Sequence, residues 1–287
     1  MRKANIQARR YASGMALIAV LWVVAALSIL VTGLSRLARD EVGLVSSLRQ
    51  SVLAQAAGDA AIALALQELA ARPAPISRTV QANINFRGQS MSVTVMPLNG
   101  LIDINSAAVP LLARVYEVAG GLSADASQAL AQSTVELRGK MGPTNQADRF
   151  EAVEDLLRVP GMDYDLYARL SPLLTVYVRA GGRVNPMAAP LGVLTVLTNG
   201  DVEEASRILQ ARESGAEGID TTSLDPSYTA VSSVRRYRVE AIVSLANGVQ
   251  MRVARVVDLG RSSRDGLPWR TLYTERSFEP LSRAVTR

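Results

Sequence analysis

The sequence contains no cysteine and no histidine among its 287 residues. Structural zinc sites of the usual kind, Ser-His-Asp and Cys-His nucleophiles, and imidazole acid–base catalysis are therefore excluded. The lack of cysteine is compatible with a reducing or an oxidising compartment. Aromatic residues are few, at 5%, whereas the apolar content of 48% is ample for a buried core. Composition thus gives little support to an enzyme.

Acidic residues are absent before Asp40, and this absence accounts for most of the net charge of +5. Four of the five charges come from Arg2, Lys3, Arg9 and Arg10, and from position 15 onward 27 basic residues face 26 acidic ones. The body of the chain is therefore close to neutral. The body of the chain has no excess of basic residues that would bind phosphate groups, so its composition does not indicate a nucleic-acid-binding protein.

Charged residues are also absent from positions 11–35, "YASGMALIAVLWVVAALSILVTGLS". As a helix this run would span roughly 37 Å, which exceeds the hydrocarbon core of a bilayer, about 30 Å thick. The basic residues before it favour an N-terminus in the cytoplasm and export of the bulk of the chain. Three interpretations are open: an uncut anchor, a cleaved secretory signal, and a helix that is cut at its start and packs into a fibre.

The helical pattern continues beyond the apolar run, because apolar residues recur along one face and no proline intervenes before Pro73. A single helix over 15–71 would be roughly 85 Å long. After Pro73 the pattern alternates with the period of a strand. A hairpin is predicted over 80–95 with Gly88 in its turn.

A second hairpin is predicted near the other end of the chain, around Asn247-Gly248, a pair suited to a type I′ turn, and one more strand is expected over 270–278. Residues 101–218 between the two sheet parts look helical and too regular for a loop. The sequence therefore predicts an α+β protein: a long N-terminal helix and an antiparallel sheet that is interrupted by a large helical insert.

The helical stretch contains a weak internal echo, in which Asn105 and Pro110 correspond to Asn185 and Pro190. Each Asn is expected to cap the short helix that follows, with the Pro in its first turn. Recurrent capping chemistry explains the echo as well as a duplication does, so both origins stay open.

The segment "DLLRVPGMDYDLYARLSPLL" is typical of a helix–hairpin–helix, with Pro160 and Gly161 in the turn. In that module backbone N–H groups of a glycine-rich hairpin bind a phosphate, so a membrane-tethered DNA-binding protein is the alternative function. Asp163 stands where a second glycine would be, with Asp165 close by, and both carboxylates would repel phosphate. A purely structural turn between helices is the favoured interpretation.

Carboxylates are the remaining candidates for chemistry. They lie at Glu203 and Glu204, at Glu151, Glu154 and Asp155, and in a loop at Asp220 and Asp225. The helical ones are more often solvated or capping charges than acid–base pairs. The two loop aspartates are weak candidates for a hard cation, with turn capping favoured. A membrane-anchored enzyme that works through carboxylates is the third hypothesis.

Several stretches together resemble the type IV pilin class and, within it, the K-type minor pseudopilins of type II secretion systems. They occur in the family's order as "GMALIAVLWVVAAL", "AQAAGDAAIALALQEL", "GLIDINSA", "LLRVPGM", "LYARLSPLLTVY" and "GGRVNPMAAPLGVLTVL". The last three stretches are specific to the family, whereas the leader indicates only the class.

The resemblance implies a non-enzymatic subunit at the tip of a periplasmic pseudopilus, which supports export of folded proteins across the outer membrane. It implies cleavage by the prepilin peptidase after Gly14, methylation at Met15, and possession of sterile-alpha-motif-like (SAM-like) parts in the insert. The implied partners are the minor pseudopilins I and J, other pseudopilins and the inner-membrane secretion platform. Calcium is bound by some members.

The implied division of the chain is a leader, a transmembrane segment, a stalk helix, a first sheet part, a helical insert of two weakly similar halves, and a second sheet part with the C-terminal tail. These correspond to residues 1–14, 15–35, 36–72, 73–100, 101–218 and 219–287. The protein is expected to be a single-pass protein of the inner membrane, with a cytoplasmic N-terminus and a periplasmic C-terminal domain.

Ala19 departs from the general pilin pattern, because most pilins carry Glu at this fifth mature position. A carboxylate at that depth costs about 2.5–3.5 kcal/mol on insertion scales, so it persists where it has a partner. In the pilin class the partner is the N-terminal amine of the subunit above. A subunit with nothing above it needs no such Glu, so Ala19 is consistent with the tip. An ordinary anchor helix would carry the same residue.

Overall fold

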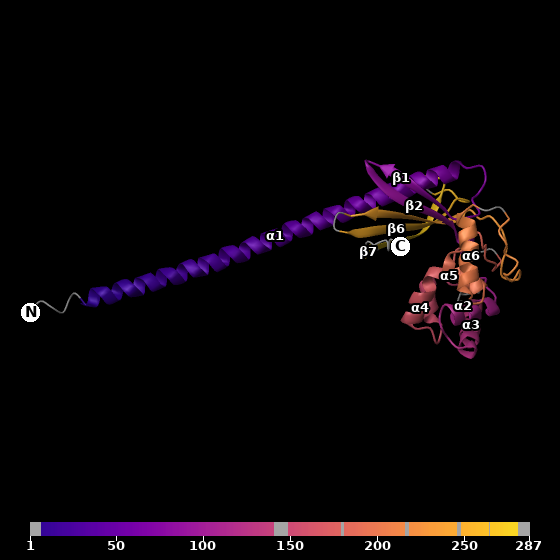
Figure 1. The fold of residues 1–287 in the computed structure, drawn as a ribbon, viewed down its shortest axis with the longest axis horizontal. Helices are drawn as coiled ribbons and strands as arrows, with labels where there is room; N and C mark the ends of the chain where they lie inside the picture. Colours follow the sequence, from indigo (N-terminus) through magenta and orange to yellow (C-terminus); the bar gives the residue numbers. More distant parts are fainter. Residues whose placement is uncertain are drawn as a thin grey trace, which may run out of the picture. The chain divides into compact units, whose positions relative to one another are not determined.

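The computed structural model describes residues 7–140, 149–178, 181–215, 218–245, 248–263 and 265–280, with the backbone alone for 7–17, 31–44 and 280. The chain forms two compact units, residues 1–54 and residues 55–287. As the sequence predicts, the fold is α+β, with a long N-terminal helix, an antiparallel sheet and a helical region (Figure 1).

Helix α1 extends over Gln7–Ala71. It contains the expected helix of 15–71 and begins eight residues earlier. No proline interrupts it, and its many Ala and Leu residues are strong helix formers.

The sheet has five strands in the order β1-β2-β5-β6-β7, and every neighbouring pair is antiparallel. The strands are β1 (Val80–Phe86), β2 (Gln89–Pro97), β5 (Arg236–Ser244), β6 (Val249–Asp258) and β7 (Arg270–Pro280). Both predicted hairpins and the additional last strand are confirmed. In the first hairpin Arg87 and Gly88 both take positive φ, 51° and 80°, as a two-residue type I′ turn requires. Asn247 lies outside the described residues.

The last turns of α1 pack closely on one face of the sheet. A Cβ added to Gly58 would lie 2.9 Å from a side-chain methyl of Val253 in β6, so the helix backbone comes close to the side chains of this sheet face. The Asp59 carboxylate accepts a hydrogen bond of 2.7 Å from Arg255, and Ile62 is fully buried. Residues 55–71 of α1 therefore form the core helix of the second unit, residues 55–287.

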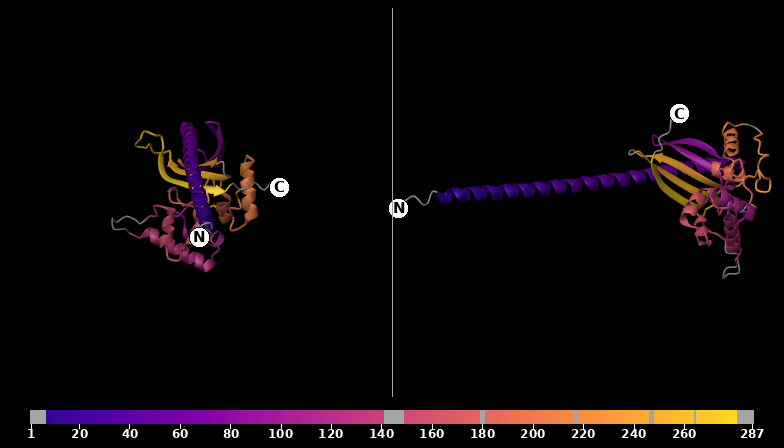
Figure 2. Two further views of the ribbon diagram at one scale, coloured as in Figure 1. Left: turned by 90° about the vertical axis from the view of Figure 1, so that its left-hand side faces the viewer. Right: turned by 60° about the horizontal axis from the view of Figure 1, so that its bottom comes forward.

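The helical insert lies between β2 and β5 in the sequence and gathers at one end of the sheet (Figure 2). Its α-helices are α2 (Val109–Val118), α3 (Ala124–Gly139), α4 (Tyr164–Leu170), α5 (Leu191–Leu197) and α6 (Val202–Glu213). Three 3₁₀ helices are also present: η1 (Leu98–Gly100), η2 (Val153–Arg158) and η3 (Ser171–Leu173). A two-stranded parallel ladder joins β3 (Ile102–Asp103) to β4 (Leu174–Thr175).

One continuous core joins the insert to the sheet. The fully buried Tyr116 of α2 and Leu98 of η1 belong to the same apolar cluster as Val256 of β6. At the junction, a Cβ added to Gly100 would lie 2.4 Å from the backbone carbonyl of Ala188. The segment that directly follows β2 therefore meets the rest of the insert through backbone contact as well as through side chains.

The capping expected of Asn105 is wrong. Helix α2 begins after Ala108, which caps it with no side-chain bond. The Asn105 amide instead donates to the Phe150 carbonyl at 2.9 Å, and its carbonyl accepts from the Phe150 N–H at 3.0 Å. Because both polar ends of this side chain are satisfied by a residue 45 positions away, tertiary pairing has replaced local capping. The Pro expectation holds here, since Pro110 lies in the first turn.

The expectation for Asn185 is also wrong, because Pro190 is the N-cap of α5 and not a residue of its first turn. Asn185 is fully buried and donates to the Ser77 carbonyl at 2.8 Å. Its side-chain oxygen accepts from the Met187 N–H at 3.0 Å. Asn185 therefore connects the insert to the segment before β1. The two Asn residues that correspond in the sequence thus have different partners, because Asn105 bonds to Phe150 within the insert.

Candidate assembly and binding sites

The N-terminal part of α1 exposes large apolar side chains all round. Ile18, Trp22 and Leu30 are 60%, 72% and 68% exposed. Ala19 is exposed on the same helix, and Gly14 and Met15 lie within α1, where the structure describes the backbone alone. Apolar side chains this exposed require lipid or other helices around them.

In its described part the chain contains one helix long and apolar enough to cross a membrane, Val45–Ala71, and a shorter apolar helix, Ile18–Leu30. The longer one is not the better candidate for a span, because 39% of its most apolar stretch is buried in the folded protein. In addition, Asp59 on this helix forms an ion pair with Arg255 of β6. A core helix passes the same test of length and composition. The apolar residues around Ile18–Leu30, without charge over 11–35, fit a bilayer better.

The turn at Val159–Met162 has the geometry of a tight hairpin between short helices. Gly161 takes φ of 93°, and the Met162 N–H donates to the Val159 carbonyl at 3.0 Å. Pro160 and Gly161 are exposed. The Asp163 carboxylate caps α4 by accepting from the Leu166 N–H at 2.7 Å. A carboxylate thus occupies the helix N-terminus that a phosphate would need, so the turn gives the DNA-binding alternative no support.

Asp220 and Asp225 each hold their own turn. The Asp220 carboxylate accepts from the Thr222 hydroxyl at 2.6 Å and from its N–H at 3.0 Å, and these bonds lower its pKa. The Asp225 carboxylate accepts from the Ser227 N–H at 2.8 Å, which lowers its pKa likewise. Across the residues with described side chains, no group of three or more carboxylates could hold a metal ion. Calcium binding stays a prediction of the resemblance.

The carboxylates on helices also have structural partners. Glu204 forms an ion pair with Arg207 and accepts from the Ser223 hydroxyl at 2.5 Å, and these hydrogen bonds lower its pKa to about 2. Glu203 belongs to the same first turn of α6. Asp155 accepts from the N–H groups of Glu151 and Ala152 at the start of η2. Glu204, held ionised by its hydrogen bonds, is a poor general acid at neutral pH.

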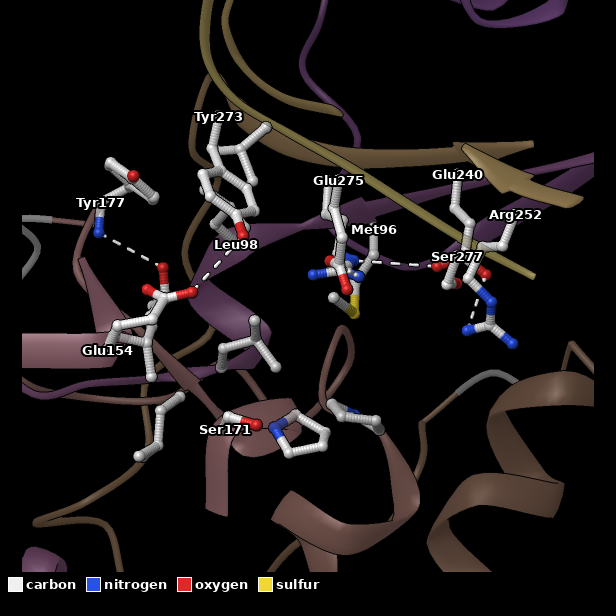
Figure 3. Close-up of a pocket in the computed structure, with 18 of the residues that line it drawn as sticks. Met96, Leu98, Glu154, Ser171, Tyr177, Glu240, Arg252, Tyr273, Glu275 and Ser277 are labelled. Carbon is white, nitrogen blue, oxygen red and sulfur yellow. Dashed lines mark hydrogen bonds and ion pairs between the residues drawn. The ribbon is translucent and has the colours of Figure 1, made fainter. Parts of the chain in front are cut away.

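A cavity of about 460 Å³ lies between the open face of the sheet and the insert (Figure 3). Strands β5, β6 and β7 form one wall, and η2, α4 and η3 form the other. Its volume falls within the range of small-molecule sites, about 300–1,000 Å³. Glu154 is the one of the sequence's candidate carboxylates that lines it.

Charged side chains follow the sheet wall of this cavity as a ladder. Arg238 pairs with Glu275 at 2.8 Å, and Arg252 pairs with Glu279 at 2.8 Å and with Glu240 at 3.2 Å. The sheet wall therefore carries three carboxylates and two guanidinium groups. Glu154 adds a fourth carboxylate from the insert, so the cavity lining has a net charge of −2.

Three tyrosines from different elements surround Glu154. The Tyr273 hydroxyl donates to its carboxylate at 3.4 Å, and Tyr167 is close enough for Glu154 to raise its pKa. Tyr177 lines the same cavity and is close enough for the Glu154 charge to act on its hydroxyl. Burial, together with the Glu154 charge, raises the pKa of Tyr167 to about 12 and raises the pKa values of Tyr177 and Tyr273. All three hydroxyls therefore stay protonated at physiological pH.

Sequence reasoning missed this cavity. Strand alternation places Arg238 and Glu240 on one face of β5, but it does not say which element covers that face. The Tyr cluster joins Tyr167 and Tyr177 of the insert to Tyr273 of β7, which lies about a hundred positions further along the chain, and only the tertiary fold brings them together.

Comparisons with known proteins bear on the fold. No family in a scan of protein families matches the sequence, and no curated protein matches it either. Among solved structures, the chain is similar to a chain of the GspK-GspI-GspJ complex from the type 2 secretion system of enterotoxigenic Escherichia coli. The identity is 13%, the TM-score is 0.50, and the match covers 81% of this chain and 97% of that one. At this identity the similarity shows a shared fold.

Proposed function

We propose that the chain is a minor pseudopilin of the K type in a type II secretion system, anchored in the inner membrane before it assembles. The observation that carries the proposal is the combination of two features in one chain. An exposed apolar helix precedes a core helix packed on an antiparallel sheet, and the sheet is interrupted by a helical insert. The fold shared with a chain of the GspK-GspI-GspJ complex supports this assignment.

The apolar part of α1 has two successive environments in this proposal. In the membrane, residues 15–35 span the bilayer with the basic N-terminus in the cytoplasm and the folded unit in the periplasm. After cleavage following Gly14 and methylation of Met15, the same helix packs against other pseudopilin helices. Ala19 leaves no carboxylate to pair with a subunit above, so the chain occupies the tip.

Partner helices meet the stalk part of α1 through its exposed apolar side chains. Leu48 and Val52, one turn apart, are 56% and 64% exposed. The similar solved structure is a complex of GspK with GspI and GspJ, and we propose the corresponding minor pseudopilins as partners here. The prepilin peptidase and the inner-membrane platform act on and recruit the subunit. The proposed role needs no catalytic group.

Single-cysteine crosslinking tests the proposed contact, because the chain has no cysteine of its own. Leu48→Cys should form a disulfide with cysteines placed along the stalk helix of a minor pseudopilin in the same membranes. Glu203→Cys is the matched control, since Glu203 is exposed on α6 of the insert. Crosslinking at neither site, or equally at both, would contradict a specific stalk interface.

A further inference from the structure

We propose that the cavity between the open sheet face and the insert binds an arginine or lysine side chain from another subunit of the same fibre. The identity of the partner rests on the proposed function. The binding site itself rests on the charges, rings and apolar surface described below.

The charge distribution favours a cationic occupant. Glu240, Glu275 and Glu279 already bond to guanidinium groups of the sheet wall. Glu154 differs, because within the described residues its carboxylate accepts a bond from the Tyr273 hydroxyl and no basic side chain pairs with it. An added positive charge would bring the lining from −2 to −1, whereas an anion would be repelled by Glu154 and by the net charge of the lining.

The tyrosine cluster supplies the second element of a cation site. Tyr177 and Tyr273 lie on two sides of the Glu154 carboxylate (Figure 3), and Tyr167 joins them from α4. Aromatic faces attract ammonium and guanidinium groups, and a guanidinium can bond a carboxylate with two parallel hydrogen bonds. The hydroxyl bond from Tyr273 holds the carboxylate in place for such contacts.

The remaining lining suits the stem of a long basic side chain. Leu98, Leu174 and Val256 are almost fully buried beneath the cavity, with Pro172 and Met96 beside them. Lysine and arginine bury their methylene stems on apolar surface while the charged end reaches polar partners. A divalent metal ion fits less well, since among the residues with described side chains no three carboxylates are placed so that they could hold a metal ion together.

The test uses the full chain in non-ionic detergent, with ¹³C-labelled tyrosine rings observed by NMR. The probe is acetyl-Gly-Arg-Gly-amide, and the control peptide replaces arginine with citrulline, which has nearly the same shape and no charge. The rings of Tyr167, Tyr177 and Tyr273, assigned with single Phe variants, should shift saturably with the arginine peptide. The citrulline peptide should bind roughly tenfold more weakly, a difference of one decade in the dissociation constant.

Two variants connect binding to the carboxylate. Glu154→Gln should weaken binding of the arginine peptide roughly tenfold. Glu151→Gln, an exposed glutamate in the same segment and outside the cavity lining, should change it less than about twofold, a difference well under one decade. Tyr273→Leu removes one aromatic ring and leaves Glu154 in place. It should also weaken binding of the arginine peptide, which tests the contribution of the rings separately from that of the carboxylate.

Several outcomes would overturn the proposal. Equal binding of the two peptides, absence of saturable ring shifts, or unchanged binding in Glu154→Gln would each rule out a cation site. Self-association that vanishes in Glu154→Gln would make a second copy of this chain the occupant instead of a partner subunit. Because the titration uses the isolated chain, its failure would leave the proposed fibre role intact, and failure of crosslinking at Leu48 would leave the titration result standing.

Discussion

Gly100→Ala should push the insert residues around Ala188 away from η1, the segment that directly follows β2. The added methyl would lie 2.4 Å from the Ala188 carbonyl carbon and oxygen, and 2.8 Å from the Ala189 nitrogen. These are backbone atoms, and the turn that carries them is fixed by a 2.7 Å bond from the Asn185 N–H to the Asn99 carbonyl. Overpacking typically costs 1–3 kcal/mol, and loss of that bond adds about 1 kcal/mol.

The free energy of unfolding should therefore fall by about 3 kcal/mol, which corresponds to a Tm lower by roughly 6–12 °C for a domain of this size. Thermal unfolding followed by near-ultraviolet circular dichroism measures the change. Gly139→Ala is the matched control, because it lies at the end of α3 with no atom within 4 Å of the added methyl. A Tm for Gly100→Ala within about 2 °C of the parent, under 1 kcal/mol, would refute the close approach.

Three further predictions concern single interactions. A double-mutant cycle on Asp59→Ala and Arg255→Ala, measured by unfolding, should give a coupling of about 0.5–1 kcal/mol that weakens in high salt, and zero coupling would contradict the contact between α1 and β6. Because folding raises the pKa values of Tyr116 and Tyr167 to about 12 from 10.0, their protonated forms stabilise the fold fully below pH 10, and this contribution should be lost as the pH rises through 12. An ultraviolet titration of tyrosinate with all tyrosines ionising near pH 10 would rule this out. Asp163→Ala should lower stability by about 1 kcal/mol through loss of the α4 cap, whereas Asp163→Asn should change it little, and equal losses would show that charge matters more than capping.

Local sequence pattern was sufficient for the elements whose partners are near in sequence. The alternation on both sides of Gly88 predicts β1 and β2, because a two-residue turn fixes their register. The long helix α1 follows from an apolar run continued by strong helix formers without proline before Pro73. These features depend on neighbours within about ten residues, where propensity and periodicity decide the outcome.

Contacts between distant segments were not predictable from the sequence. The short parallel pairing of Ile102 with Leu174 joins segments 72 positions apart, and neither segment carries a strand pattern of its own. Asn105 was expected to cap a helix, but this half-buried amide bonds to Phe150, which satisfies both its donor and its acceptor.

The cavity around Glu154 illustrates the same limit for function. From the sequence, Glu154 is one of several acidic residues near η2, and nothing distinguishes it from Glu151. The structure places Glu154 against Tyr167, Tyr177 and Tyr273, whereas Asp155 beside it is used to cap η2. Which carboxylate faces a cavity is decided by packing and not by spacing along the chain.

The intact mass and N-terminal sequence of the protein from inner membranes test the central proposal most directly. They should be compared in strains with and without an active prepilin peptidase. The pseudopilin assignment predicts a chain that begins at N-methylated Met15, and only where the peptidase is active. A chain that retains residues 1–14 in both strains would contradict the assignment and make α1 a permanent anchor.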